Sequence, residues 1–286
     1  MAEQSIARLL AQGHHFLSGS GALDSRIDSE YLMAHLLRVP RLEMLLRGGE
    51  TLGEEMAEAY RSLCERRANG IPLQYITGEQ GFMGFTFHVD GRVLIPRPET
   101  ELLCEAGIAF IKGLEGSGSK EKNAPMVLDL CTGSGALGIS VALLCKGAKV
   151  HASDISETAL TVAMENARGL GAVVTFQQGD FLEAVSGLRF HLILCNPPYI
   201  PTGELPMLQR EVKSEPSLAL DGGEDGLRFY RSLAVQGRGH LYPGGAIFCE
   251  VGYDQGERVS RLFEEQGYKP VSLKNDLANI PRLMLA

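Results

Sequence analysis

The sequence predicts an α/β fold whose larger domain is built on a mainly parallel sheet of about seven strands. From residue 125 onward, short apolar runs alternate with longer segments of helical periodicity, which is the pattern of repeated β-α-β units. A glycine-rich turn joins the first apolar run to its helix, and a later run stops abruptly at two consecutive prolines. Both features indicate the carboxyl edge of a parallel sheet, where ligands bind.

The elements of this sheet follow one another in regular order. Strands are expected at 126–130, 149–153, 173–177, 190–195 and 245–251, then near 268–273 and at 280–285. Helices are expected at 136–145, 156–168, 227–240 and 254–266. The run at 192–195 (L-I-L-C) is apolar throughout, as in a strand that is buried on both faces. A long insertion at 201–225 separates this strand from the next helix.

The segment ahead of the sheet has a different character. Residues 1–72 carry helical periodicity and predict a small bundle of four or five short helices that docks a substrate. Asp90-Gly91 separates two strand-like segments, 85–89 and 92–95, and predicts a β-hairpin within a linker at 73–97. Pro98 and the acids that follow it favour a helix start, which opens the larger domain at 98–286. The Gly/Ser-rich stretch at 113–123 predicts a flexible loop.

The composition limits the function classes. The net charge is -8, and the first 73 residues hold 8 Lys and Arg against 10 Asp and Glu, which disfavours a stable nucleic-acid partner. The six cysteines form no C-x-x-C pair and no ligand spacing with histidine, so reduced thiols and no metal are expected. No run approaches the roughly 18 apolar residues of a membrane helix. The amino terminus also lacks a basic region followed by an apolar core, which indicates a cytoplasmic protein without a membrane partner.

The turn after the first strand carries a ligand-binding pattern. Gly133, Gly135 and Gly138 match G-x-G-x-x-G, and Asp154 ends the next strand 21 residues after Gly133. This spacing is typical of dinucleotide sites, in which the acid binds a ribose hydroxyl, and S-adenosylmethionine sites are built in the same way. Asp129 at the end of the first strand favours a cationic ligand such as a sulfonium amino acid over a pyrophosphate.

The tetrapeptide Asn196-Pro197-Pro198-Tyr199 follows the buried strand at 190–195. The two prolines keep the backbone extended and leave carbonyl groups unpaired. The Asn196 amide oxygen and a backbone carbonyl can accept hydrogen bonds from a flat –NH₂ group, while the Tyr199 ring covers its face. An amino group bound there would lie close to a cofactor held by the glycine-rich turn.

These motifs together resemble those of class I S-adenosylmethionine-dependent amino-group methyltransferases, which have a Rossmann-like sheet. Three further stretches narrow the resemblance: 72–78 (P-L-Q-Y-I-T-G), 93–101 (V-L-I-P-R-P-E-T-E) and 215–223 (E-P-S-L-A-L-D-G-G). They are similar to the protein-(glutamine-N(5)) methyltransferases of peptide chain release factors, the PrmC/HemK family. The resemblance is strong over 70–286 and weaker over the helical amino terminus.

The resemblance implies roles for individual residues. Cofactor binding falls to Asp129, Cys131, Thr132, Gly133, Ser134, Gly135, Asp154, Asp180, Phe181 and Asn196. The target glutamine of a Gly-Gly-Gln loop is bound by Asn196, Pro197, Pro198 and Tyr199, and Asn196, Pro197 and Tyr199 carry catalysis. Many relatives have Gly in place of Cys131 and Trp in place of Phe181. Arg97, Glu99 and Thr100 are expected either near this site or in helix-start and interdomain ion pairing.

The expected reaction needs no strong base. A carboxamide nitrogen is a weak nucleophile, so the site must align it with the methyl group and stabilise the positive charge that develops on it. A nucleic-acid adenine or guanine amino methyltransferase is the main alternative, since it shares N-P-P-Y, but the acidic balance disfavours it. A nicotinamide oxidoreductase would leave N-P-P-Y unexplained, and intact motifs speak against a non-catalytic binding module.

Overall fold

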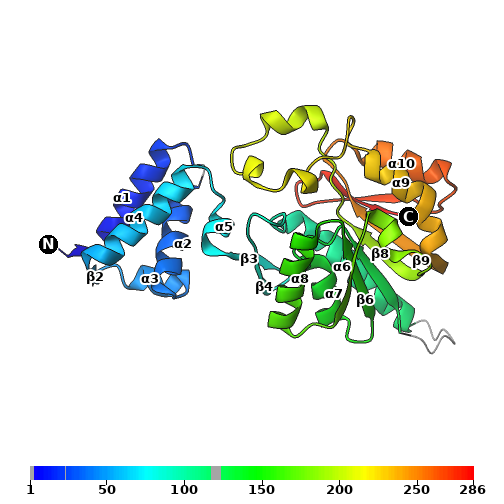
Figure 1. Cartoon of the computed structure of the whole chain (residues 1–286), viewed down its shortest axis with the longest axis horizontal. Coiled ribbons are helices and arrows are strands. Elements are labelled where there is room, and N and C mark those ends of the chain that lie inside the picture. The colour runs from blue at the N-terminus through cyan, green and yellow to red at the C-terminus, as the bar shows by residue number, and fades with distance from the viewer. Residues whose placement is uncertain (1–2, 23, 117–123) are drawn as a thin grey trace. The chain divides into compact units, whose positions relative to one another are not determined.

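The structure is a computed structural model that describes residues 3–22, 24–116 and 124–286 (Figure 1). The chain divides into two compact units. The first comprises Met1–Glu79 together with Gln209–Ser214, and the second comprises Gln80–Leu208 together with Glu215–Ala286. Within the described ranges, no helix combines the length and apolar character needed to cross a membrane.

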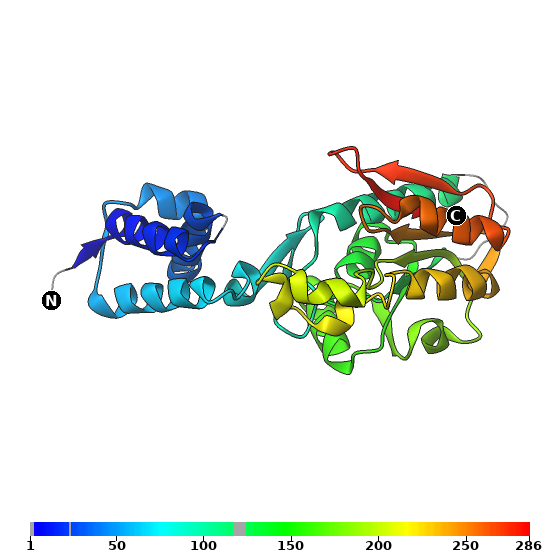
Figure 2. The same cartoon turned by 90° about the horizontal axis from the view of Figure 1, so that it is seen from above.

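The first unit is a helical bundle, as its periodicity predicted. Its helices are α1 (Ile6–Gly19), α2 (Ser25–Leu37), α3 (Arg41–Leu46), α4 (Glu54–Ala68) and α5 (Leu73–Thr77), with two-residue strands β1 (Gln4–Ser5) and β2 (Thr51–Leu52). The long helices lie side by side around a buried apolar core (Figure 2). Arg67 is buried in this unit, where it pairs with Asp28 at 2.7 Å and with Glu211 at 2.9 Å. The ion pair between buried Arg67 and Glu211 thus holds Gln209–Ser214 against the bundle.

The hairpin lies earlier in the chain than predicted. Strands β3 (Glu79–Phe82) and β4 (Phe85–His88) pair with each other, and Met83 and Gly84 form the turn with φ of 51° and 79°. The prediction of a hairpin around Asp90-Gly91 is wrong, because 92–95 is not a strand. The Asp90 carboxylate instead accepts hydrogen bonds from the backbone N–H and the guanidinium of Arg92, which closes a local turn.

The second unit is built on a seven-stranded sheet, which confirms the predicted fold class. Its strands are β5 (Met126–Leu130), β6 (Lys149–Asp154), β7 (Val174–Gln178), β8 (Phe190–Cys195), β9 (Leu241–Glu250), β10 (Ser272–Asn275) and β11 (Pro281–Leu285). Their order is β10-β11-β9-β8-β5-β6-β7. The pairs β5–β6, β5–β8, β6–β7 and β8–β9 are parallel, and β11 is antiparallel to both of its neighbours.

Helices cover both faces of this sheet. One face packs against α6 (Pro98–Gly116), α7 (Ala136–Leu144) and α8 (Glu157–Leu170), and the other against α9 (Arg228–Gln236) and α10 (Gly256–Glu265). The strand β8 serves both cores, since Leu192 and Leu194 lie in the first and Ile193 and Cys195 in the second. Helix α6 continues through 113–116, where a loop was predicted, and the rest of that predicted loop at 117–123 lies outside the described residues.

The topology places the site. The sheet order reverses at β5, which has β6 on one side and β8 on the other, so the carboxyl ends of these strands border a crevice. The insertion after N-P-P-Y contains three short 3₁₀ helices, Thr202–Met207, Val212–Ser214 and Ser217–Ala219. Its far end returns to the tetrapeptide, because Ile200 N–H donates to the Leu220 carbonyl at 3.0 Å. The insertion therefore forms one wall of the crevice.

Candidate active site

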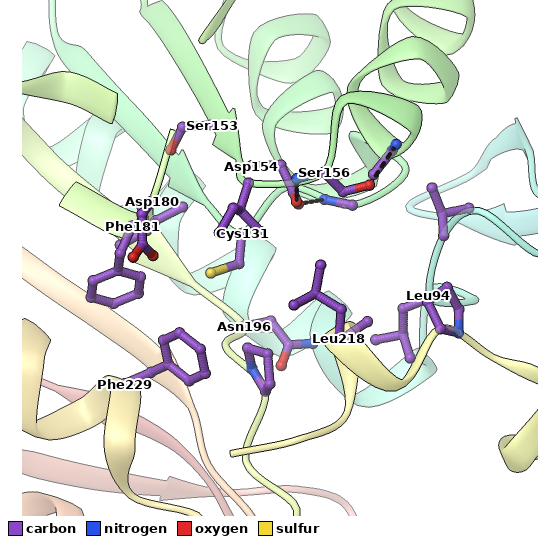
Figure 3. Close-up of a pocket in the computed structure, with 18 of the residues that line it drawn as sticks. Leu94, Cys131, Ser153, Asp154, Ser156, Asp180, Phe181, Asn196, Leu218 and Phe229 are labelled. Carbon is purple, nitrogen blue, oxygen red and sulfur yellow. Dashed lines mark hydrogen bonds between the residues drawn. The ribbon is translucent and has the colours of Figure 1, made fainter. Parts of the chain in front are cut away.

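A cavity of about 940 Å³, counting its open mouth, lies at the carboxyl ends of β5, β6 and β8 (Figure 3). Its walls come from five places in the second unit: the segment after β4, the glycine-rich turn, the ends of β6 and β7, N-P-P-Y, and the insertion with the start of α9. A smaller cavity adjoins it and shares Leu94, Cys131, Gly133 and Asn196. The shared residues make the two cavities parts of one candidate ligand site.

The Asp129 side chain is hydrogen-bonded to both ends of the glycine-rich turn. It is only 2% exposed, and its Oδ2 accepts hydrogen bonds from Gly138 N–H at 2.8 Å and from the Thr132 hydroxyl at 2.5 Å. A Cβ on Gly138 would meet the Asp129 Cβ at 2.9 Å, so the third glycine is required by close packing. Burial raises the pKa of Asp129 to about 6. A cationic group bound in the smaller cavity, which Asp129 lines, would favour the charged carboxylate.

Asp154 at the end of β6 braces the turn and faces the larger cavity. Its Oδ2 accepts from Gly133 N–H at 2.9 Å, and its Oδ1 accepts from Ser156 N–H at 2.9 Å. Burial raises the pKa of Asp154, and the three backbone N–H groups around it act in the opposite direction. The carboxylate is therefore held in one orientation at the cavity wall.

One end of the cavity is aromatic. The rings of Phe181 and Phe229 lie 5.4 Å apart between centroids at an interplanar angle of 50°, and Asp180 lies beside them (Figure 3). Phe181 has a left-handed backbone with φ of 49°, as has Cys131 with φ of 63°. Phe229 was not foreseen, because nothing in the sequence distinguishes it from other aromatic residues on an amphipathic helix. The two rings contact each other and form an apolar wall against which a flat ring with polar edges can pack.

Asn196 lies where the two cavities meet, and its side chain is fixed by hydrogen bonds. Its Nδ2 donates to the Thr100 hydroxyl at 3.2 Å, and that hydroxyl donates to Glu250 Oε2 at 2.5 Å. The Tyr199 hydroxyl donates to the other oxygen of Glu250 at 3.3 Å. Thr100, which was expected either near the site or in helix-start and interdomain ion pairing, lies at the site. Glu250 was not predicted as a site residue.

Arg97 lines the smaller cavity and forms an ion pair with Glu215 of the insertion. Glu215 is buried and its Oε2 also accepts from Ile95 N–H at 3.0 Å. This interaction explains why 92–95 is not a strand, since the N–H of Ile95 is directed at a side chain. Arg97 therefore lies near the site, and its ion pair with Glu215 lies within the second unit and is not the interdomain pair that was the alternative expectation.

The structure brings most of the predicted site residues together, with some exceptions. The larger cavity is lined by Cys131, Gly133, Asp154, Asp180, Phe181, Asn196 and Pro198, and the smaller one adds Asp129, Thr132 and Ser134. Gly135, Pro197 and Tyr199 line neither. Gly135 begins α7 with φ of 83°, and a Cβ there would meet Ile139 at 2.6 Å. The Tyr199 side chain points to Glu250, and its carbonyl accepts from Gln255 at 2.8 Å.

The sheet order with its antiparallel β11, the glycine-rich turn after β5, the acid ending β6 and N-P-P-Y after β8 define a class I methyltransferase. The fold is similar to the hMettl16 catalytic domain solved in complex with MAT2A 3′UTR hairpin 6, with a TM-score of 0.54 at 13% identity over 83% of this chain and 84% of that one. At this identity the likeness concerns the fold alone.

Sequence comparisons identify the family. Residues 8–78 match the PrmC N-terminal domain and residues 115–219 match the methyltransferase small domain. The chain is 41% identical to the release factor glutamine methyltransferase of Moorella thermoacetica, over 99% of this chain and 98% of that one. It is 38% identical to that of Clostridium acetobutylicum, over 91% and 90%. The chain belongs to the family of release factor glutamine methyltransferases, which confirms the resemblance seen in its motifs.

Proposed function

We propose that this chain transfers the methyl group of S-adenosylmethionine to the side-chain amide nitrogen of the glutamine in the Gly-Gly-Gln motif of peptide chain release factors. The observation that carries the proposal is the placement of the Asn196 amide at the junction of the two cavities. Asn196 Nδ2 is occupied by Thr100, so its oxygen is the atom left to accept from a substrate –NH₂ group. The names and near-complete coverage of the relatives support the substrate.

The residues present fit this cofactor. Phe181, Phe229 and Asp180 would hold the adenine, Asp154 the ribose hydroxyls, and Asp129 with the glycine-rich turn the methionine part. Ser153 supports a polar ligand here: it lines the larger cavity, and its buried Oγ has no hydrogen-bond partner among the described residues. When bound, S-adenosylmethionine would supply an electrophilic methyl group on a sulfonium.

The protein's own task is alignment and charge stabilisation. The Asn196 oxygen and the Pro197 carbonyl accept hydrogen bonds from the two amide hydrogens, which orients the nitrogen lone pair. These acceptors stabilise the positive charge that grows on nitrogen during transfer. Tyr199 lines neither cavity, and its hydrogen bond to Glu250 would hold N-P-P-Y in place. The proton passes to solvent after the methyl group has been transferred. A side-chain base is not needed, because a neutral amide does not lose its proton beforehand.

Transfer of labelled methyl to a purified release factor tests the function. We expect label on the whole factor and none on a factor whose Gly-Gly-Gln glutamine is changed to alanine. RNA and DNA serve as competing substrates, and label on either would instead support a nucleic-acid amino methyltransferase. The acidic net charge of -8 supports a protein substrate without a stable nucleic-acid partner. The names of the relatives support a cytoplasmic role in translation termination, where release factors act.

The helical bundle is proposed to dock the release factor, with 1–72 as the docking domain, 73–97 as the linker and 98–286 as the methyltransferase domain. Its surface supports this role. Leu42 and Leu46 on α3 are 74% and 89% exposed, and Ile27 and Tyr31 on α2 are also exposed. Large apolar side chains that gather on one small unit are typical of a protein-binding surface.

A double variant, Leu42→Glu with Leu46→Glu, tests the docking role. Loss of two apolar anchors should lower kcat/KM for the whole factor by roughly tenfold or more. The rate on a short peptide carrying the Gly-Gly-Gln loop should not change. Val173→Glu is the matched control, because Val173 is also 89% exposed but lies in the second unit. Equal losses on peptide and whole factor would contradict docking through the bundle.

Cofactor affinity should depend on pH through Asp129. Its pKa in the free protein is about 6, and a bound ammonium would lower that value. Binding therefore releases protons below pH 6, so affinity should fall by up to roughly tenfold per pH unit on further acidification. Asp129→Asn should bind more weakly at pH 7.5 and lose the pH dependence. Titration calorimetry at several pH values measures both, and a variant that keeps the wild-type pH profile would remove Asp129 from cofactor binding.

A further inference from the structure

Glu250 is a buried carboxylate with no role in the reaction described so far. It ends β9, the strand that pairs with β8, and only 2% of its surface is exposed. Its two oxygens accept from two hydroxyls, those of Thr100 on α6 and Tyr199 of N-P-P-Y. Its backbone carbonyl accepts from the Tyr230 hydroxyl of α9 at 2.8 Å. Three separate elements thus converge on one residue beside the site.

The chemistry of these groups fixes the direction of each hydrogen bond. An ionised carboxylate only accepts, so Thr100 and Tyr199 must each donate their one hydroxyl hydrogen to Glu250. The Thr100 oxygen then has only lone pairs left for Asn196, and it accepts from Nδ2 at 3.2 Å. If the amide were rotated by half a turn, the Asn196 oxygen would face those lone pairs without a hydrogen between them. The chain of bonds therefore selects one of two nearly isosteric orientations.

Neighbouring charges act on Glu250 from both directions. Burial raises its pKa, and Glu99 on α6 adds to this effect. The hydrogen bonds from Thr100 and Tyr199 and the positive charge of Arg282 on β11 favour the ionised form instead. Burying a carboxylate costs free energy unless the group is hydrogen-bonded or paired. The hydrogen bonds that offset this cost also hold the Glu250 carboxylate toward N-P-P-Y.

We propose that Thr100 and Glu250 are positioning residues that hold the Asn196 amide with its oxygen toward the substrate nitrogen. The proposal rests on the proposed function and deepens it. Thr100 lines the smaller cavity, and Glu250 lies behind it. They act through Asn196, and Glu250 in addition fixes the Tyr199 side chain.

Thr100→Val is the decisive variant, because valine keeps the shape of threonine and removes the hydroxyl. Single-turnover methyl transfer to a release factor should slow by roughly 10- to 100-fold, as expected when a reacting group loses its alignment. The affinity for S-adenosylmethionine and the Tm should stay close to wild type. Thr100→Ser, which retains the hydroxyl, should recover most of the lost rate. Glu250→Gln should also slow transfer, since an amide nitrogen that donates replaces one of the two accepting carboxylate oxygens.

A double-mutant cycle separates positioning from a structural role. In an Asn196→Ala background, Thr100→Val should cost no further rate, because Thr100 acts only through the missing amide. Multiplicative losses, or a Thr100→Val rate equal to wild type, would overturn the proposal. If Thr100→Val does not fold, the cycle with Glu250→Gln and Asn196→Ala decides the question: the combined loss should be smaller than the product of the two single losses, because only the part that acts through Tyr199 remains, and a fully multiplicative loss would overturn the proposal. A wild-type protein that leaves release factors unmethylated would instead refute the proposed function itself.

Discussion

Asn196→Ala should slow single-turnover methyl transfer to a release factor by about 100-fold or more, the size of effect seen when a charge-stabilising group of an active site is removed. The substrate amide would lose an acceptor for one of its hydrogens and with it both alignment and charge stabilisation. The fold should survive, because the Asn196 side chain lies where the two cavities meet and, among the described residues, makes a single hydrogen bond, to Thr100. Circular dichroism and the Tm of the variant check this point.

Asn196→Asp tests whether an acceptor oxygen at this position is sufficient for the reaction, or whether that oxygen must also be oriented by a hydrogen bond to Thr100. Aspartate keeps an oxygen but cannot donate to Thr100, and its charge adds to those of Asp129 and Asp154. We expect cofactor binding to persist, since the added negative charge attracts a sulfonium, and methyl transfer to be much slower than in wild type. A release factor lacking the Gly-Gly-Gln glutamine provides the blank. Wild-type rates in Asn196→Ala would remove Asn196 from the active site and refute the mechanism.

The larger fold was predictable because its signals are local. Each strand of the sheet is a short apolar run, and L-I-L-C at 192–195 has no polar face, as burial between two helical layers requires. The turn motif also identifies itself locally, since Gly138 must lack a Cβ to pass Asp129. Such features depend on neighbours within ten residues of chain, and these can be read from sequence alone.

The predictions that missed concern partners distant in the chain. The segment 92–95 is not a strand, because Ile95 N–H donates to the Glu215 side chain, 120 residues away. Phe229 reaches the cavity from a helix that follows a long insertion, and Glu250 reaches Thr100 across 150 residues. No periodicity or spacing encodes these contacts, since each joins elements that meet only in the folded chain. Sequence motifs therefore predicted many of the residues that line the cavities. They did not predict the residues, distant in the chain, that hold those side chains in place.

Asp154→Ala should weaken S-adenosylmethionine binding by roughly 10- to 150-fold, which corresponds to about 1.5–3 kcal/mol for a lost charge-assisted hydrogen bond. Part of the loss could come from the turn, because Gly133 and Ser156 N–H groups would lose their acceptor. Asp154→Asn distinguishes the two contributions, since an amide oxygen still accepts from a backbone N–H but carries no charge. It should bind more tightly than alanine and less tightly than wild type.

A cofactor analogue that lacks a ribose hydroxyl, S-(2′-deoxyadenosyl)homocysteine, makes the test specific to the proposed contact. Wild type should prefer S-adenosylhomocysteine over this analogue, because the deoxy compound leaves the Asp154 carboxylate without its partner. Asp154→Ala should bind the two compounds almost equally, since the group that recognises the hydroxyl is gone. Calorimetric titration of both compounds against both proteins completes the cycle. If the variant discriminates as strongly as wild type, Asp154 serves the turn alone and the ribose is held by another group.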